Sequence, residues 1–151
     1  MIVVADVLKT ISDSGSLELF RIVALTKPDT DMLISKTRLT RKQYYLRISR
    51  LMKAGLIKRK NGKYTLTAFG KVIYYTVLII MENATSIYWK LNVIDSLEMS
   101  NDLPVEERRK IIDSFIDGQK IKDLLISHNR KVEPTGPYDI ELQTHQLRIP
   151  S

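Results

Sequence analysis

The middle of the chain holds a concentration of positive charge. From Met32 to Met81 there is no Asp or Glu, while the remainder of the 151 residues carries all 17 acids, and the whole chain has a net charge of +7. The basic residues of this segment are Lys36, Arg38, Arg41, Lys42, Arg47, Arg50, Lys53, Lys58, Arg59, Lys60, Lys63 and Lys71. Charge confined to one segment indicates that it binds a polyanion, and nucleic acid is the first candidate.

Other kinds of chemistry find little support in the sequence. The chain has no Cys, which excludes disulfides, thiolate metal sites and Cys nucleophiles. Its only histidines, His128 and His145, have no carboxylate pair beside them at metal-ligand spacing. There is also no glycine-rich phosphate loop and no Ser-His-Asp grouping. We therefore predict no enzymatic activity, no metal site and no cofactor.

The N-terminus lacks the features of a signal peptide, because Asp6 and Lys9 interrupt its apolar stretch. The most apolar run, Val72 to Met81, is well short of the roughly 20 residues that span a bilayer. A chain that is 44% hydrophobic can nevertheless bury a proper core. These features predict a folded cytoplasmic protein without a membrane partner.

Three short helices are expected ahead of the most basic stretch. Val4, Val7, Leu8 and Ile11, at steps of three and four, predict the first helix, which is expected to end near Ser12 to Gly15. Ser16 is the expected cap of the second, which must end before Pro28 because proline excludes the preceding residue from the α region. Asp29 or Thr30 can cap the third.

The fourth helix and the hairpin after it carry most of the basic residues. Thr40 and Gln43 have the spacing of a capping box, and Gly55 is suited to end the helix after about Ala54. Asn61-Gly62, between two short extended runs, predicts a hairpin with a type I′ turn.

A long helix is expected from Thr67 to about Leu97. It contains three heptads of an apolar seam, predicted to form the dimerisation contact or to pack on the chain's own C-terminal helices: Ile73, Val77, Ile80, Ala84, Ile87, Leu91 and Ile94. A second apolar strip is expected to pack on the chain's own core, and consists of Tyr75, Leu78, Trp89 and Val93. Two further helices are expected after Pro104, from Val105 to Ile116 and from Gln119 to Ser127.

The order and spacing of these elements resemble a known family. The stretch from Leu39 to Ile57, with its exit Leu51-Met52-Lys53-Ala54-Gly55-Leu56-Ile57, resembles the recognition helix of archaeal and bacterial winged helix-turn-helix transcription regulators. The segment from Lys58 to Lys71 is similar to their wing. The similarity covers about residues 17–75, two fifths of the chain, and is greatest to small archaeal regulators.

The resemblance implies a mostly α (α+β) fold, in which a winged helix-turn-helix with a small β-hairpin wing precedes a long dimerisation helix and C-terminal helices. We expect a DNA-binding domain at residues 1–70, a helical region for dimerisation and possible sensing at 71–127, and an extended or flexible tail at 128–151. The predicted partners are double-stranded DNA and a second copy of the chain. The only residues that favour binding of a small-molecule effector are the aromatic residues Tyr74, Tyr75, Tyr88 and Trp89, which could line a pocket. Packing is the better explanation for them.

Helical geometry divides the fourth helix into two faces. The core face is expected to hold Tyr44, Ile48, Leu51 and Met52. Lys42, Gln43, Leu46, Arg50 and Lys53 lie opposite, with Arg47 on the flank. Since the first residues of a recognition helix reach base edges, Gln43 and Arg47 are candidate base readers and Leu46 can touch a thymine methyl group.

The remaining basic residues are expected to hold phosphates. The complete set of predicted DNA-binding residues is Thr40, Arg41, Lys42, Gln43, Leu46, Arg47, Arg50, Lys53, Arg59, Lys60 and Lys63. A sequence-specific, homodimeric transcription regulator is the favoured function. The alternatives are a non-specific architectural DNA-binding protein and a winged-helix interaction module of a transcription assembly.

Overall fold

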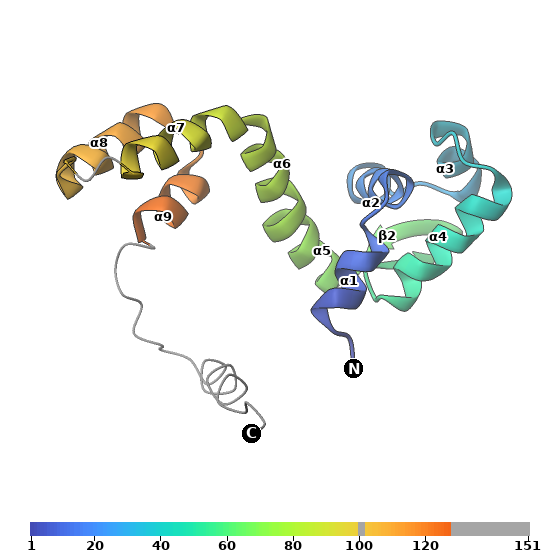
Figure 1. The fold of residues 1–151 in the computed structure, drawn as a ribbon. Helices are drawn as coiled ribbons and strands as arrows, with labels where there is room; N and C mark the ends of the chain where they lie inside the picture. The colour runs from blue at the N-terminus through green and yellow to red at the C-terminus, as the bar shows by residue number, and fades with distance from the viewer. Residues whose placement is uncertain (100–101, 128–151) are drawn as a thin grey trace, which may run out of the picture. The chain divides into compact units, whose positions relative to one another are not determined.

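The computed structural model describes residues 1–99 and 102–127, and these are mostly helical with one two-stranded antiparallel sheet (Figure 1). The chain forms two compact units that meet between Glu82 and Asn83, later than the boundary expected at residue 70. The tail expected at 128–151, with both histidines, lies outside the described residues.

The first unit begins with the helices α1 (Val4–Thr10), α2 (Ser14–Thr26), α3 (Thr30–Lys36) and α4 (Arg41–Lys53). The cap of α2 is Asp13 and the expectation of Ser16 is wrong, because the Asp13 carboxylate accepts a hydrogen bond from the Ser16 backbone N–H at 3.0 Å. Asp29 caps α3 in the same way, through the backbone N–H of Met32. Helix α2 ends as expected just before Pro28.

Helix α4 and the following hairpin, β1 (Ile57–Lys60) and β2 (Lys63–Leu66), confirm the local signals in the sequence. The Thr40 hydroxyl accepts from the Gln43 backbone N–H at 3.3 Å, and the Gln43 side chain accepts from the Thr40 backbone N–H at 3.0 Å. Gly55 takes a positive φ of 72° after the helix. Asn61 and Gly62 have φ of 51° and 75°, as a type I′ turn requires.

The core of the first unit joins α4 to α2, α3 and the hairpin. Its fully buried side chains include Leu19, Phe20, Leu33, Tyr44, Leu51 and Leu56. Met52, expected on this core face, is instead 42% exposed. It lies about 80° around the helix from Tyr44, at the margin of the arc that the neighbouring elements cover. Ile48 is buried as expected.

The hairpin is fastened to the connection between α2 and α3. The Tyr64 backbone N–H donates to the Pro28 carbonyl at 2.8 Å, and Asp29 and Lys63 form an isolated antiparallel bridge. Because these bonds join backbone to backbone, they hold the hairpin beside the helices that flank it.

The helix expected to run from Thr67 to Leu97 is interrupted. It consists of α5 (Ala68–Ile73), the π-helical segment η1 (Tyr74–Leu78), α6 (Ile79–Ser86), which crosses the boundary between the units, and α7 (Tyr88–Met99) after a turn at Ile87. A π-helical turn contains more residues than an α-helical one, so a heptad count drawn across η1 loses its phase. Tyr74 and Leu78 follow the buried Gly70 at steps of four and are themselves buried, Leu78 as expected, whereas Tyr75, also expected to pack on the core, is exposed.

The second unit packs α7 with α8 (Val105–Phe115) and α9 (Gln119–Ser127), both close to the expected bounds. Its buried residues include Ile94, Ile112, Ile116 and Ile121. Trp89 and Val93, expected to pack on the chain's own core, are both exposed, although the Trp89 ring meets the edge of Phe115. No helix in residues 1–99 and 102–127 is both long enough and apolar enough to cross a membrane.

Candidate nucleic-acid interface

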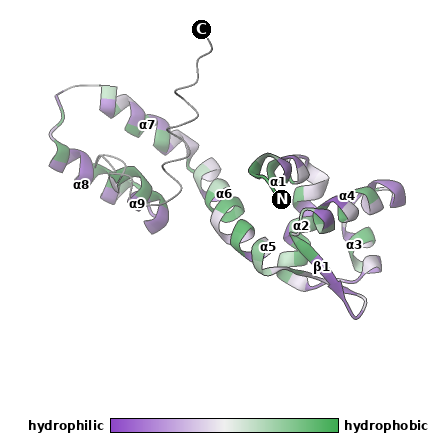
Figure 2. Ribbon diagram, turned by 90° about the horizontal axis from the view of Figure 1, so that it is seen from below, coloured by the Kyte–Doolittle hydropathy of each residue, from purple (hydrophilic) through white to green (hydrophobic). Residues whose placement is uncertain are grey.

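Helix α4 presents a polar, cationic side opposite its buried one. Tyr44, Ile48 and Leu51 fix its orientation by burial in the core. The residues predicted on the other side, Lys42, Gln43, Leu46, Arg50 and Lys53, are all exposed, and so is Arg41 at the start of the helix. Figure 2 shows α4 and the outer part of the hairpin as hydrophilic.

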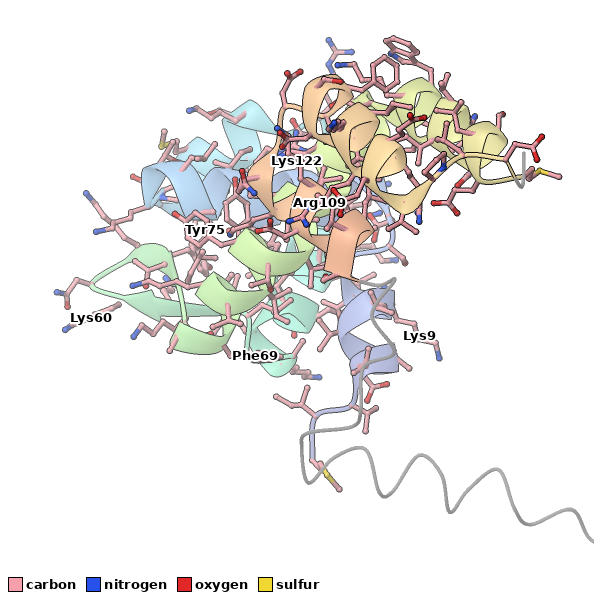
Figure 3. All side chains as sticks on the ribbon, turned by 90° about the vertical axis from the view of Figure 1, so that its left-hand side faces the viewer. Lys9, Lys60, Phe69, Tyr75, Arg109 and Lys122 are labelled. Atoms are coloured by element: carbon pink, nitrogen blue, oxygen red, sulfur yellow. The ribbon has the colours of Figure 1, made fainter. Side chains whose placement is uncertain are left out.

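In the hairpin, strand alternation sorts the basic residues into two sets. Ile57, Tyr64 and Leu66 point to the core, and Arg59 stands directly opposite Tyr64 with its guanidinium 5.5 Å from the centre of the ring. Lys58, Lys60 and Lys63 occupy the alternate positions and are exposed. Lys60 projects from the tip (Figure 3). Lys58 was missing from the predicted site, although the period of two places it with Lys60.

We call the exposed basic residues of these two elements the basic surface: Arg41, Lys42, Arg50, Lys53, Lys58, Arg59, Lys60 and Lys63. None of them forms an ion pair with any other part of the chain that the structure describes. Lys60 and Lys63 are directly paired across the hairpin. Like charges in that arrangement destabilise a sheet. The fold therefore leaves this charge without acidic partners in the described residues, and an external polyanion would relieve the repulsion between Lys60 and Lys63.

Arg47 differs from the basic surface, because it is held inside the molecule. Its Nε donates to the Asp13 carboxylate at 2.8 Å and its Nη1 to the Gln43 carbonyl at 3.3 Å, leaving 21% of the side chain exposed. A Cβ on Gly15 would lie only 2.9 Å from the Arg47 Nε, so glycine makes room for the guanidinium. Arg47 therefore fastens α4 to the start of α2.

The Asp13 carboxylate receives three donors. Partial burial raises the pKa of this carboxyl, but hydrogen bonds from the Ser16 hydroxyl, Arg47 and the Ser16 backbone, with the charge of Arg47, outweigh it and lower the pKa to about 2. Sequence reasoning missed Asp13 and Gly15. The local cap was readable from the sequence, but the ion pair with a residue 34 positions away was not.

Gln43 also uses part of its hydrogen-bonding capacity within the protein. Its Oε1 accepts from the Thr40 backbone, which leaves the side-chain NH₂ as its outward-facing group. Recognition of adenine by Gln uses both the oxygen and the NH₂. With the capping box closed, the Gln43 NH₂ is still able to donate, which suits the acceptor atoms on the edges of the bases.

Tyr44 links α4 to the hairpin beneath the surface. It is fully buried beside Tyr64 and Thr30, yet its hydroxyl makes no hydrogen bond of ordinary geometry with any described residue. Burial, aided by the Tyr64 hydroxyl, raises the pKa of Tyr44 far above its usual range. Tyr44 therefore acts through packing and stays neutral.

The residues predicted for dimerisation are partly or fully buried. None of the seven is exposed, and Ile94 is buried against its own unit. Ile73 packs on the core of the first unit and, with Val77, lines a small apolar cavity next to α1. Of the aromatic residues considered for effector binding, Tyr74 is buried and Tyr75, Tyr88 and Trp89 are exposed.

No group of three or more metal-binding side chains occurs within the described parts of the chain. No protein-family model, curated protein or solved structure matches this chain.

Proposed function

We propose that this chain is a sequence-specific, homodimeric transcription regulator that binds double-stranded DNA through a winged helix-turn-helix. The supporting observation is the basic surface, whose eight cations are exposed and without ion pairs in the described residues. In this proposal α3 and α4 are the helix-turn-helix, α4 enters the major groove, and the β1–β2 hairpin is the wing.

In this proposal the contacts to DNA are of two kinds, those to phosphates and those to bases. The cations of the basic surface neutralise phosphates, which supplies affinity that does not depend on sequence. Gln43 and Leu46, exposed near the start of α4, are the base readers that remain accessible. Arg47 reads a base only through the edge of its guanidinium that Asp13 does not occupy.

The runner-up function, a non-specific architectural DNA-binding protein, has one observation in its favour. Gln43 and Arg47 both spend part of their hydrogen-bonding capacity inside the protein. Few side chains are then left to discriminate bases, while many are left to hold the backbone.

Binding to duplex DNA at several salt concentrations tests the proposal. If each copy neutralises about three or four phosphates, a dimer shows a slope of log K against log salt of roughly −5 to −7. Lys60→Ala removes one phosphate contact from each of the two copies and lowers the magnitude of that slope by about 2. Lys120→Ala, at an exposed lysine of α9, is the matched control and leaves the slope unchanged. No measurable affinity for any duplex at low salt refutes DNA binding.

Gln43→Glu separates the specific from the architectural function. Glutamate preserves the oxygen that accepts from Thr40, so the capping box and the fold survive. It removes the outward-facing donors, so a specific regulator changes its preference at one base pair by about 1–3 kcal/mol. The readout compares sequences selected from a random DNA pool with wild-type protein and with the variant. Identical, unselective pools for both proteins favour the architectural function.

A further inference from the structure

Five exposed side chains lie on the side of α4 opposite its core. Measured at about 100° per residue from the buried Tyr44, Ile48 and Leu51, they fall within about 55° of the direction that points away from the core. They are Lys42, Leu46, Ser49, Arg50 and Lys53. Gln43 and Arg47 lie farther round the helix, about 75° and about 115° from that direction. A groove that takes the outward side of α4 therefore meets the five side chains first.

Charged and uncharged side chains are segregated along this side of α4. Lys42 precedes the uncharged Leu46 and Ser49, and Arg50 and Lys53 follow them. At a rise of about 1.5 Å per residue, Lys42 and Lys53 are about 16 Å apart along the axis, and Leu46 and Ser49 about 4.5 Å. The major groove is about 12 Å wide and curves away from a straight helix, so the middle of α4 lies nearest the base edges. The uncharged pair is therefore placed for bases, and the cations at either end are placed for phosphates.

The hydroxyl of Ser49 is free. A serine or threonine inside a helix either points to solvent or bonds back to a carbonyl of the preceding turn. In this chain the hydroxyls of Thr26 and Thr76 donate to the carbonyl four residues earlier, and those of Ser35 and Ser114 to the carbonyl three residues earlier. Ser49 is exposed, and its hydroxyl has no hydrogen-bond partner within the part of the chain that the structure describes. Its donor and its acceptor positions are both available to a ligand.

Ser49 can therefore bind a base without breaking a hydrogen bond inside the protein. The accepting oxygen of Gln43 and one edge of the Arg47 guanidinium are already occupied there. Leu46, one turn before Ser49 and 48% exposed, offers the apolar contact that suits a thymine methyl group. A serine hydroxyl bonds to donors or acceptors, so it favours the base pair that places a partner atom within its reach.

We propose that Ser49 is a base-reading residue of α4, whose hydroxyl bonds to the edge of the base pair next to the one that Leu46 contacts. The rise of about 4.5 Å between the two residues is close to the spacing of about 3.4 Å between successive base pairs, so the two side chains meet neighbouring pairs. The inference rests on the proposed function. It adds to Gln43 and Leu46 a third accessible base reader, at the middle of the helix.

Selection of sequences from a random DNA pool tests this role in the full chain. Ser49→Ala removes the hydroxyl and should reduce discrimination at one base pair of each half-site by roughly 3- to 10-fold, the effect of one hydrogen bond. Leu46→Ala should reduce discrimination at the neighbouring base pair. Ser114→Ala, at an exposed serine of α8, is the matched control and should select the same sequences as the wild type. A Ser49→Ala pool identical to that of the wild type overturns the inference.

Two further measurements exclude other causes of a change. Alanine has a higher helix propensity than serine and no internal hydrogen bond is lost, so thermal unfolding of Ser49→Ala should occur at or slightly above the wild-type temperature. Because serine carries no charge, the slope of log K against log salt should equal that of the wild type. A Ser49→Ala variant that binds all sequences more weakly by the same factor would place the hydroxyl on the DNA backbone and overturn base reading.

The proposed function and the role of Ser49 fail in different ways. A wild-type protein with no affinity for any duplex refutes the proposed function, and the role of Ser49 with it. A wild-type protein that selects a sequence, beside a Ser49→Ala variant that selects the same sequence equally well, refutes the role of Ser49 alone. Changes at two base pairs that are not neighbours in Ser49→Ala and Leu46→Ala overturn the proposed arrangement of the two side chains.

Discussion

The pairing of Asp13 with Arg47 gives the sharpest test of how α4 is held. Arg47→Ala breaks the 2.8 Å hydrogen bond that joins α4 to the start of α2, and Asp13→Asn weakens it by removing the negative charge of its acceptor. If Arg47 serves mainly to position the helix, Arg47→Ala and Asp13→Asn weaken binding to all DNA sequences alike. If Arg47 reads a base, Arg47→Ala changes the preference at one base pair and Asp13→Asn does not.

The pKa of the Asp13 carboxyl group gives the free energy of unfolding that this pairing contributes. A pKa lowered from 3.8 to about 2 corresponds to at most about 2.5 kcal/mol, at about 1.4 kcal/mol per pH unit. The Asp13 side chain is 39% exposed, so solvent screening reduces this to about 1 kcal/mol, which Arg47 shares with Ser16. We therefore expect each single variant to lose about 1 kcal/mol of unfolding free energy.

The Asp13 carboxylate also makes the stability of the fold depend on pH in the acid range. Because folding lowers the pKa of Asp13, its contribution is complete above pH 3.8 and is lost as the pH falls from 3.8 towards 2. Urea unfolding from pH 5 to pH 2 should show this loss in the wild type and not in Asp13→Asn. A double-mutant cycle at neutral pH measures the coupling, with Arg50→Ala as the unpaired control on the same helix. A coupling energy of zero, with both singles at wild-type stability, would refute the positioning role.

Three further substitutions test the packing around α4, each by urea unfolding. Gly70→Ala places a Cβ 1.8 Å from the Leu56 carbonyl oxygen and should lower the free energy of unfolding by about 3 kcal/mol or more. Gly118→Ala is the control: its Cβ meets only a side-chain methyl group at 3.9 Å, so the loss should be less than about 1 kcal/mol. Gly62→Ala forces a positive φ on alanine and should cost about 1 kcal/mol, and no loss would argue against the type I′ turn. Tyr44→Phe removes a buried hydroxyl without a partner and should be neutral or stabilising by up to about 1 kcal/mol; a loss of that size would instead show that the hydroxyl is hydrogen-bonded.

The sequence predicted those features of the fold whose physics is local. The capping box of Thr40 and Gln43 and the turn at Asn61-Gly62 each depend on residues at most three positions apart. Such features can be predicted from the sequence because one short segment supplies all of their donors, acceptors and backbone angles. The polar side of α4 could be predicted for the same reason.

Features that depend on contacts between distant segments could not be predicted. Nothing near Gly70 in the sequence shows that its Cα must approach the Leu56 carbonyl, and nothing near Arg47 shows that Asp13 will hold it. The burial of Tyr74 in place of Tyr75 depends on which face of α5 packs on the first unit, where Gly70, one turn before Tyr74, lies against Leu56. At the candidate site, the sequence therefore predicted correctly that the basic residues of α4 and the hairpin are exposed. The hydrogen bonds that Gln43 and Arg47 make within the protein could be seen only in the structure.

The backbone bonds that tie the hairpin to the α2–α3 connection have a consequence for the choice of ligand. The Tyr64 N–H on the Pro28 carbonyl and the bridge between Asp29 and Lys63 keep the spacing between the hairpin tip and α4 nearly constant. In the proposed mode of binding, a duplex must match that spacing before any base is inspected. The deep, narrow major groove of A-form RNA does not admit a helix, so double-stranded RNA of the same sequence should be rejected on width alone.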